Sequence, residues 1–277
     1  QFASSAASDV YKRQNMNNPK LIKHIVNWLN SYSKNSKTNG FVIGVSGGID
    51  SAVTSTLCAK TGLPTLCLEM PIHQSSKELE RSKKHIQWLK SNYGNVESKY
   101  LDLAKSFDEI KTSISITSKK NNELALANSR SRLRMLTLYY FASVNNFLVA
   151  GTGNKVEDFG VGFYTKYGDG GVDLSPIADL MKSEVRSIAK EMGINNDIII
   201  AEPTDGLWDD TRTDENQIGA SYNELEWAMN ELDKGKSESD FSGREKEVFN
   251  ILKNFNTVNK HKMVPIPICE IPESLKN

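Results

Sequence analysis

Apolar residues in the first 150 positions follow two spacings, one helical and one typical of buried strands. Helical spacing begins after Pro19 and places five apolar side chains on one face: Leu21, Ile22, Ile25, Val26 and Leu29. We expect the polar stretch 31–39 to end this helix. Strands are predicted at 41–45, 65–70, 96–103 and 146–150, and the first of them is a continuous apolar run. Helices are predicted between them at 52–60, 77–92, 103–116 and 123–144.

Strands that alternate with helices of this length predict an α/β fold, a doubly wound parallel sheet with helices on both faces. Such sheets bind ligands at the carboxyl ends of their strands. The glycine-rich segment 151–173 is too long for a simple connector, so we expect a functional loop. Further helices are expected at 181–192, 222–232 and 244–255. The acidic, aperiodic stretch 204–216 predicts a mobile loop.

A chain of 277 residues is long enough for one large domain. Residues 1–15 are polar and lack the apolar segment of a secretory signal, so they are interpreted as a disordered or non-native extension. Met16 is then the expected start of a single domain spanning 16–277. The 38% of hydrophobic and 25% of charged residues have the ordinary balance of a globular protein.

Charge, cysteine content and the lack of a long apolar stretch disfavour several classes of partner. Lys+Arg and Asp+Glu both number 34, so the net charge is zero and no long-range field attracts nucleic acid. No stretch reaches the ~20 apolar residues of a membrane helix. Neither nucleic acid nor a membrane is therefore an expected partner. Cys58, Cys67 and Cys269 have no CxxC spacing, which disfavours a disulfide framework or zinc site and fits a reducing cytoplasm.

The strongest chemical signal is the octet Gly44-Val45-Ser46-Gly47-Gly48-Ile49-Asp50-Ser51, between an expected strand and an expected helix. Adjacent glycines let backbone N–H groups approach an anion, and the helix N-terminus adds partial positive charge. Asp50 can hold a magnesium ion beside bound phosphates. The motif of the commoner phosphate loop is not matched before Gly235-Lys236-Ser237, because Asn230 stands where its first glycine is required. The dinucleotide motif GxGxxG also fails, at Val156.

The SGGxDS pattern after the first strand resembles the pyrophosphate loop of the N-type ATP pyrophosphatases. These enzymes release pyrophosphate from ATP while transferring AMP to an acceptor, on a fold described as adenine nucleotide alpha hydrolase-like. Members include synthetases for NAD, GMP, asparagine and argininosuccinate, and tRNA-modifying enzymes. The loop therefore implies the reaction class and leaves the acceptor open.

A second block resembles the ammonia-dependent NAD synthetases over about residues 21–265. It comprises 151–157 (GTGNKVE) and 163–173 (FYTKYGDGGVD), followed by Pro176, Lys182, Pro203-Thr204 and His261-Lys262. The stretch between Glu157 and Lys166 is one residue longer than in the commonest bacterial form. The resemblance implies that the octet binds ATP together with Thr152, Lys182 and Thr204. It implies Mg²⁺ binding by Asp50 and Glu157, catalytic roles for Asp50 and Lys182, and a deamido-NAD site of five residues: Arg132, Lys166, Asp173, His261 and Lys262.

The activity implied by this resemblance is the ATP-dependent amidation of deamido-NAD to NAD. The nicotinate carboxylate attacks the α-phosphate and pyrophosphate leaves; ammonia then attacks the acyl adenylate and releases AMP. Ammonia is the expected nitrogen donor, because glutamine-dependent relatives carry an amidase domain before the core, whereas about forty cysteine-free residues precede the first strand here. The resemblance also implies a homodimer with the dinucleotide near the subunit interface. Two alternatives stay open, another N-type ATP pyrophosphatase with a different acceptor and a non-catalytic ATP-binding module.

Overall fold

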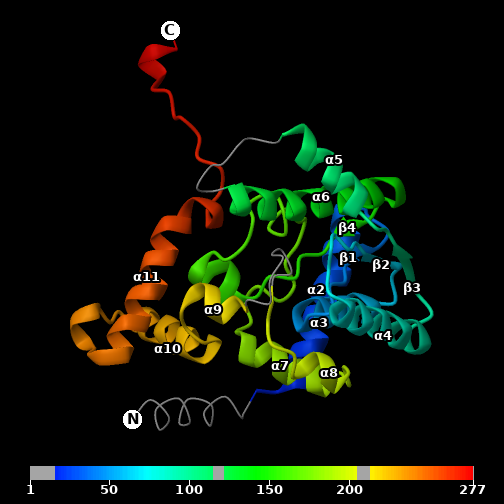
Figure 1. The fold of residues 1–277 in the computed structure, drawn as a ribbon, viewed down its shortest axis with the longest axis horizontal. Coiled ribbons are helices and arrows are strands. Elements are labelled where there is room, and N and C mark those ends of the chain that lie inside the picture. Colours follow the sequence, from blue (N-terminus) through cyan, green and yellow to red (C-terminus); the bar gives the residue numbers. More distant parts are fainter. Residues whose placement is uncertain (1–15, 115–121, 205–212, 277) are drawn as a thin grey trace.

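Four parallel strands form one sheet in the computed structural model, which describes residues 16–114, 122–204 and 213–276 (Figure 1). They are β1 (Phe41–Gly44), β2 (Thr65–Glu69), β3 (Val96–Tyr100) and β4 (Leu148–Val149), each inside a run expected from the sequence. Their order is β3-β2-β1-β4, so the chain builds outward from β1 to β3 and returns to the other side of β1. This order confirms the doubly wound sheet and places its switch point between β1 and β4.

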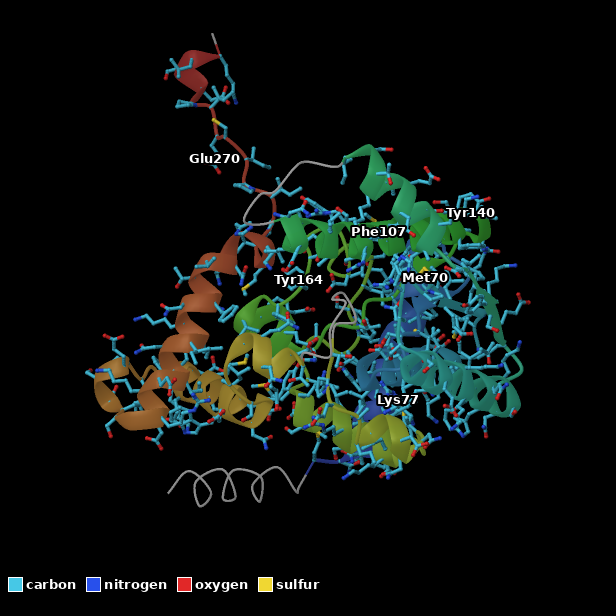
Figure 2. All side chains as sticks on the ribbon, viewed as in Figure 1. Met70, Lys77, Phe107, Tyr140, Tyr164 and Glu270 are labelled. Carbon is cyan, nitrogen blue, oxygen red and sulfur yellow. The ribbon has the colours of Figure 1, made fainter. Side chains whose placement is uncertain are left out.

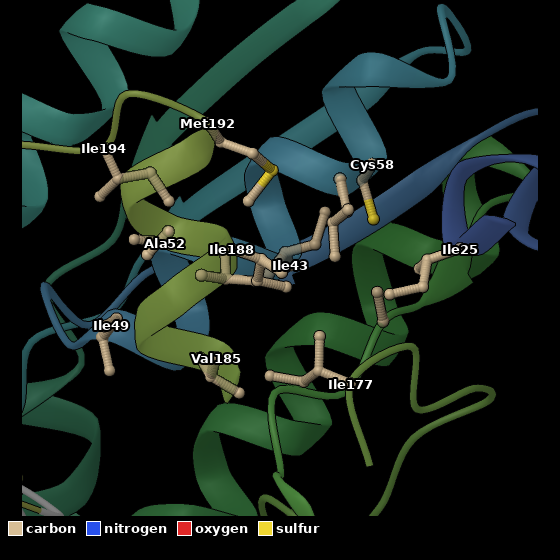
Figure 3. Close-up of a cluster of buried hydrophobic side chains, with 14 of the residues drawn as sticks. Ile25, Ile43, Ile49, Ala52, Cys58, Ile177, Val185, Ile188, Met192 and Ile194 are labelled. Atoms are coloured by element: carbon tan, nitrogen blue, oxygen red, sulfur yellow. The ribbon is translucent and has the colours of Figure 1, made fainter. Parts of the chain in front are cut away.

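Helices cover both faces of the sheet, because successive residues of a strand point in opposite directions. One face packs against α2 (Asn18–Ser36), α3 (Ile49–Lys60) and α7 (Lys182–Glu191), and the other against α6 (Asn122–Asn145). Ile43 of β1 is buried with Ala52 of α3 and Ile188 of α7 (Figure 3). Its neighbour Val42 points the other way and packs with Ala142 of α6.

Two helices complete the cover near the β2–β3 edge. These are α4 (Ser76–Asn92), which packs against β3 and α3, and α5 (Ala104–Ser113), which packs against α6. Ile86 and Leu89 of α4 bury Cys67 of β2. The short helix α8 (Asn196–Ile199) follows α7 and adds Ile198 to the core around α3.

The first helix ends at Ser36, inside the polar stretch 31–39 that was expected to end it. The buried face of α2 continues at four-residue intervals through Ile25, Leu29 and Ser33, and the helix runs to Ser36. Ser33 is almost fully buried, and its hydroxyl donates to the carbonyl of Thr38 at 2.9 Å. A small hydroxyl residue with a backbone partner thus replaces an apolar residue on the buried face.

A second core lies beside the sheet and is built from four helical elements. They are the π-helix η2 (Val156–Val161), α9 (Asp214–Ile218), α10 (Tyr222–Asp233) and α11 (Gly243–Met263), which form the yellow to red part of Figure 1 together with η2 in green. Val156 and Val161 of η2 are buried against Leu225 of α10 and Leu252 of α11. The short helices η3 (Glu238–Asp240) and η4 (Glu273–Leu275) lie at the periphery.

The last long helix extends eight residues beyond the expected end, from 255 to Met263. Asn256 donates to the carbonyls of Phe159 and Gly160 in η2, both at 2.8 Å, and Asn259 donates to Val161 at 2.9 Å. These carbonyls lie at the end of the π-helix, so the asparagines serve as partners for it. His261 and Lys262 lie in the last turn of α11, beyond the helix end predicted from the sequence.

Some expectations fall wholly or partly outside the described residues. Residues 1–15 do, and so do 205–212 of the predicted mobile loop; the loop's end at residue 216 overlaps the start of α9. Within the described ranges, helices that are long and apolar enough to cross a bilayer do not occur. The single-domain assignment for 16–277 stays a prediction.

Candidate active site

The glycine loop joins the end of β1 to the start of α3, at the carboxyl edge of the sheet. The Ser51 hydroxyl donates to the Gly48 carbonyl at 2.9 Å and accepts from the Ser46 N–H at 3.2 Å, which closes the loop into a compact turn. Gly48 is the N-cap of α3, and within the described structure no side chain caps that end. The helix N-terminus is therefore arranged to receive an anion, as the sequence predicts.

Gly47 is the loop residue whose backbone demands glycine. Its φ is +85°, in the left-handed region. A Cβ there would also collide with the Glu78 carbonyl and the Ser82 N–H, which are backbone atoms of α4. Arg81 of α4 donates to the Gly47 carbonyl at 3.2 Å. The backbone of α4 therefore packs closely against the loop at Gly47, where only glycine fits.

Asp50, Glu157 and Lys182 come from three distant parts of the chain and meet beside this loop. Asp50 lies in the first turn of α3, Glu157 in η2, and Lys182 is the first residue of α7. The ammonium Nζ of Lys182 lies 2.5 Å from Asp50 Oδ2 and 2.9 Å from Glu157 Oε1. Only 2% of the lysine side chain is exposed. A lysine at a helix N-terminus opposes the helix dipole, and the two carboxylates supply the negative charge that holds it there.

The charges of this centre do not balance, since two carboxylates share one ammonium group. Burial raises the pKa of Asp50 above its ordinary value, because the nearby Lys182 offsets only part of the desolvation. Burial also acts to raise the pKa of Glu157, but Lys182 and the Tyr222 hydroxyl outweigh it and hold that pKa below the ordinary value. Burial acts to lower the pKa of Lys182, and the two carboxylates more than reverse this. A further cation beside the two carboxylates would favour the ionised form of both.

A fully buried asparagine, Asn154, lies two residues before the π-helix that carries Glu157. Asn154 accepts hydrogen bonds from the N–H groups of Val156 and Glu157 at 3.1 and 3.2 Å, and its amide donates to Asp50 Oδ1 at 3.3 Å. The π-helix spans Val156–Val161, within the stretch between Asn154 and Lys166, and a π-turn spans one residue more than an α-turn. With this geometry Glu157, and not its neighbour Asp158, points at Lys182.

Sequence reasoning missed Tyr222, the first residue of α10. Its hydroxyl donates to Glu157 Oε1 at 2.6 Å and lies 3.3 Å from Asp214 Oδ2, and its ring faces Lys182 Nζ at 4.7 Å. Burial and the neighbouring carboxylates raise the pKa of Tyr222 far above its ordinary value, so the hydroxyl stays protonated. Tyr222 lies 65 residues after Glu157 in the chain, and the two side chains meet because α10 packs against η2.

A cleft opens over the charged centre and the loop. It is lined by every octet residue except Gly47, and by Thr152, Glu157, Lys182 and Thr204. The Thr204 hydroxyl donates to Glu78 Oε1 at 2.9 Å across the cleft. Asp158 also lines the cleft, and burial, followed by the charge of Glu157, raises its pKa to about 8. The residues expected to bind ATP and the metal are thus gathered at one place.

Four of the five residues expected to bind deamido-NAD form a separate group near α11. Arg132 of α6 donates to the Lys166 carbonyl at 3.3 Å, and Lys166 Nζ donates to the His261 carbonyl at 2.8 Å. Lys262 Nζ donates to the Tyr164 carbonyl at 2.7 Å and faces the Tyr164 ring at 5.0 Å. Tyr164, labelled in Figure 2, also lines the cleft, so it connects the two regions.

Asp173, the fifth of these residues, lies apart from the other four. Its carboxylate accepts from the Val149 N–H at 2.8 Å and from the Tyr139 hydroxyl at 3.0 Å. It therefore fixes the end of β4 to α6. Within the described residues, all five lie outside the lining of the cleft.

The doubly wound sheet, the anion-binding loop at its edge and the buried charged centre beside that loop define a nucleotide-binding α/β enzyme. The NAD synthase family model matches residues 21–265. An NH(3)-dependent NAD(+) synthetase of Carboxydothermus hydrogenoformans is 38% identical over 205 residues, which are 73% of this chain and 81% of the relative.

Two solved structures are similar over nearly their whole length. An NMN synthetase of Francisella tularensis has a TM-score of 0.80 and 30% identity, covering 93% of this chain and 100% of that one. An NH3-dependent NAD synthetase of Campylobacter jejuni has a TM-score of 0.74 and 28% identity, covering 92% and 100%. The chain belongs to the NAD synthase family. The expected family and fold class are confirmed.

Proposed function

We propose that the protein is a ligase that amidates deamido-NAD to NAD, with ATP as co-substrate and ammonia as nitrogen donor. The observation that carries this proposal is the convergence of Asp50, Glu157 and Lys182 beside the glycine loop. Family membership adds the acceptor and the ammonia, because two of the three compared relatives are NH(3)-dependent NAD(+) synthetases.

The residues of the cleft account for both steps of the reaction, which are formation of the acyl adenylate and its amidation by ammonia. The N–H groups of the loop and of the first turn of α3 bind the phosphates of ATP. The acceptor carboxylate attacks the α-phosphorus, and the bond to the departing pyrophosphate breaks while Lys182 compensates its growing charge. Ammonia then attacks the carbonyl carbon of the adenylate, AMP leaves, and the nitrogen loses a proton to water. The protein mainly aligns reactants and compensates charge.

Mg²⁺ suits the donor set of the charged centre. Magnesium in nucleotide sites takes one or two carboxylates and completes its shell with phosphate oxygens and water. Asp50 and Glu157 both lie within 3 Å of the Lys182 ammonium, so their carboxylates already face a common positive charge. When bound, Mg²⁺ would supply Lewis-acid compensation of the phosphate charge. Asp50 and Glu157 are the residues that would hold it.

The acceptor region extends from the cleft toward α11. Arg132, Lys166, His261 and Lys262 bring cationic and hydrogen-bonding groups together, which suits the phosphates of a dinucleotide. Tyr164 lies between them and the cleft and offers an aromatic face to a nicotinate or adenine ring. Asp173 orders the end of β4 next to the reacting groups.

A homodimer through α6 fits the surface of that helix. Leu136, Tyr140 and Val144 follow one another at four-residue intervals and are 63%, 63% and 66% exposed. Figure 2 labels Tyr140 on this helix. Arg132 precedes them in the same row, so the acceptor region would adjoin the subunit interface.

A cytoplasmic location fits the cysteine chemistry. Cys58 and Cys67 are both buried as free thiols, and neither takes part in a disulfide. Burial raises the pKa of each, so the thiols resist oxidation.

An assay of the purified chain with ATP, Mg²⁺ and ammonium chloride tests this function. Deamido-NAD and nicotinic acid mononucleotide are offered in separate reactions, because one structural relative is an NMN synthetase. We expect NAD to form with deamido-NAD, in amounts equal to AMP and pyrophosphate. Glutamine in place of ammonium is expected to support little turnover. Faster amidation of the mononucleotide, or ATP binding without pyrophosphate release, would contradict the proposal.

A further inference from the structure

Each carboxylate of the charged centre has a neutral hydrogen-bond donor of its own in addition to the shared lysine. Asp50 accepts from the Asn154 amide at 3.3 Å, and Glu157 accepts from the Tyr222 hydroxyl at 2.6 Å. Both donors are fully buried, with 0% exposure. Neither donor is charged, so neither adds to the charge that the site presents to a substrate.

Lys182 cannot bind the two carboxylates and the phosphates of the substrate equally well at the same time. In the proposed function, on which this inference rests, Lys182 turns toward the phosphates of ATP. Its ammonium has three N–H donors, and two of them now point at Asp50 and Glu157. Once the lysine N–H groups bind phosphate, the Asn154 amide and the Tyr222 hydroxyl are the donors that still hold the two carboxylates in place.

We propose that Tyr222 is a positioning residue that holds Glu157 in its metal-binding orientation when Lys182 engages the nucleotide. Donors that orient metal-binding carboxylates raise metal affinity because the ligand is already in place. The short distance to Glu157 Oε1 and the burial of the tyrosine give this bond its strength. The ring also lies against Lys182, with its centroid 4.7 Å from Nζ.

The position of Tyr222 also joins the two cores of the protein. It is the first residue of α10 and packs with the second core, whereas Lys182 begins α7, which packs on the sheet. The Tyr222 N–H donates to Glu215 of α9 at 2.8 Å. The hydroxyl that orients Glu157 is therefore anchored from a different part of the fold than the lysine.

Tyr222→Phe removes the hydroxyl and keeps the ring, so it tests this role directly. Mg²⁺ is titrated into the enzyme–ATP complex by calorimetry, beside steady-state pyrophosphate release at varied Mg²⁺. We expect the variant to need about 10-fold more Mg²⁺ in both measurements, the usual scale for loss of such a donor. Binding of ATP without Mg²⁺ should change less than about 2-fold, since the loop contacts remain.

Two further variants separate this role from a structural one. Tyr93→Phe, which removes a hydroxyl near the end of α4, should behave as the wild type. Adding Tyr222→Phe to Glu157→Gln should cause little further loss, because the hydroxyl acts through that carboxylate. An unchanged Mg²⁺ requirement in a folded Tyr222→Phe enzyme, or full additivity with Glu157→Gln, would overturn the inference. Failure of the wild type to release pyrophosphate would instead count against the proposed function.

Discussion

Neutralising Asp50 should slow the reaction strongly without destabilising the protein. Its pKa is raised because burial outweighs the help from Lys182, so the folded state disfavours its charge. Such a carboxylate lowers stability at neutral pH, where the unfolded chain is freely ionised. In Asp50→Asn the lysine keeps Glu157 at 2.9 Å, and the centre becomes electrically balanced. We expect a melting temperature equal to or above that of the wild type.

Asp50→Asn should lower the catalytic rate, although it should not lower the stability of the protein. It removes one of two groups that fix positive charge where the leaving pyrophosphate gains negative charge. Loss of one such element costs ~10²–10³ in rate, or roughly 3–4 kcal/mol. ATP retains its contacts with the loop, so its dissociation constant should change less than ~10-fold.

The assay is single-turnover pyrophosphate release, with ATP titrations and melting curves, for Asp50→Asn, Glu157→Gln and the double variant. The double variant should be little slower than the slower single variant, as expected of residues that serve one ion. Wild-type turnover of Glu157→Gln at limiting Mg²⁺ would refute the assignment of Glu157, and Asp158 would be examined next. A large drop in the stability of Asp50→Asn would refute the argument that the folded state disfavours the charge of Asp50.

Three further changes should alter stability in ways that calorimetry or chemical denaturation can measure. Lys182→Met leaves two buried carboxylates without their ammonium partner and should cost about 3–5 kcal/mol; an unchanged melting temperature would contradict this. Gly47→Ala places a Cβ against the α4 backbone at φ +85° and should cost more stability than Gly48→Ala, where φ is −86°; equal losses would argue against the strained turn. Burial lowers the pKa of His85 to about 4, so the unfolded chain gains a proton first as the pH falls below 6.5. The wild type should lose about 2 kcal/mol more than His85→Gln between pH 7 and 5, and parallel losses would contradict the shift.

The sheet and the glycine loop could be predicted because their signals are local. The run 41–45 is apolar throughout and leads directly into Ser46-Gly47-Gly48, so strand, turn and helix start are all marked in a dozen residues. Lys182 has a local signal as well, because a lysine at the start of a helix opposes the helix dipole. The structure pairs it with Asp50, 132 positions earlier.

The second core could not be predicted to the same extent, because tertiary contacts decide it. The π-helix depends on Asn154 at one end and on Asn256 and Asn259 at the other, and these lie about a hundred residues apart in the chain. The same contacts extend α11 through a polar stretch that has little helical signal of its own. Tyr222 has no local signal for a site, since an aromatic residue at a helix start is ordinarily part of a core.

Isotope transfer tests the central claim, an acyl adenylate formed at the charged centre, most directly. Deamido-NAD labelled with ¹⁸O in its nicotinate carboxylate is incubated with the wild-type protein, ATP, Mg²⁺ and ammonium chloride, and the products are analysed by mass spectrometry. The account predicts one ¹⁸O atom in the phosphate of AMP and none in pyrophosphate, because the carboxylate oxygen that attacks the α-phosphorus stays on AMP. Unlabelled AMP, or label in orthophosphate released with ADP, would contradict it.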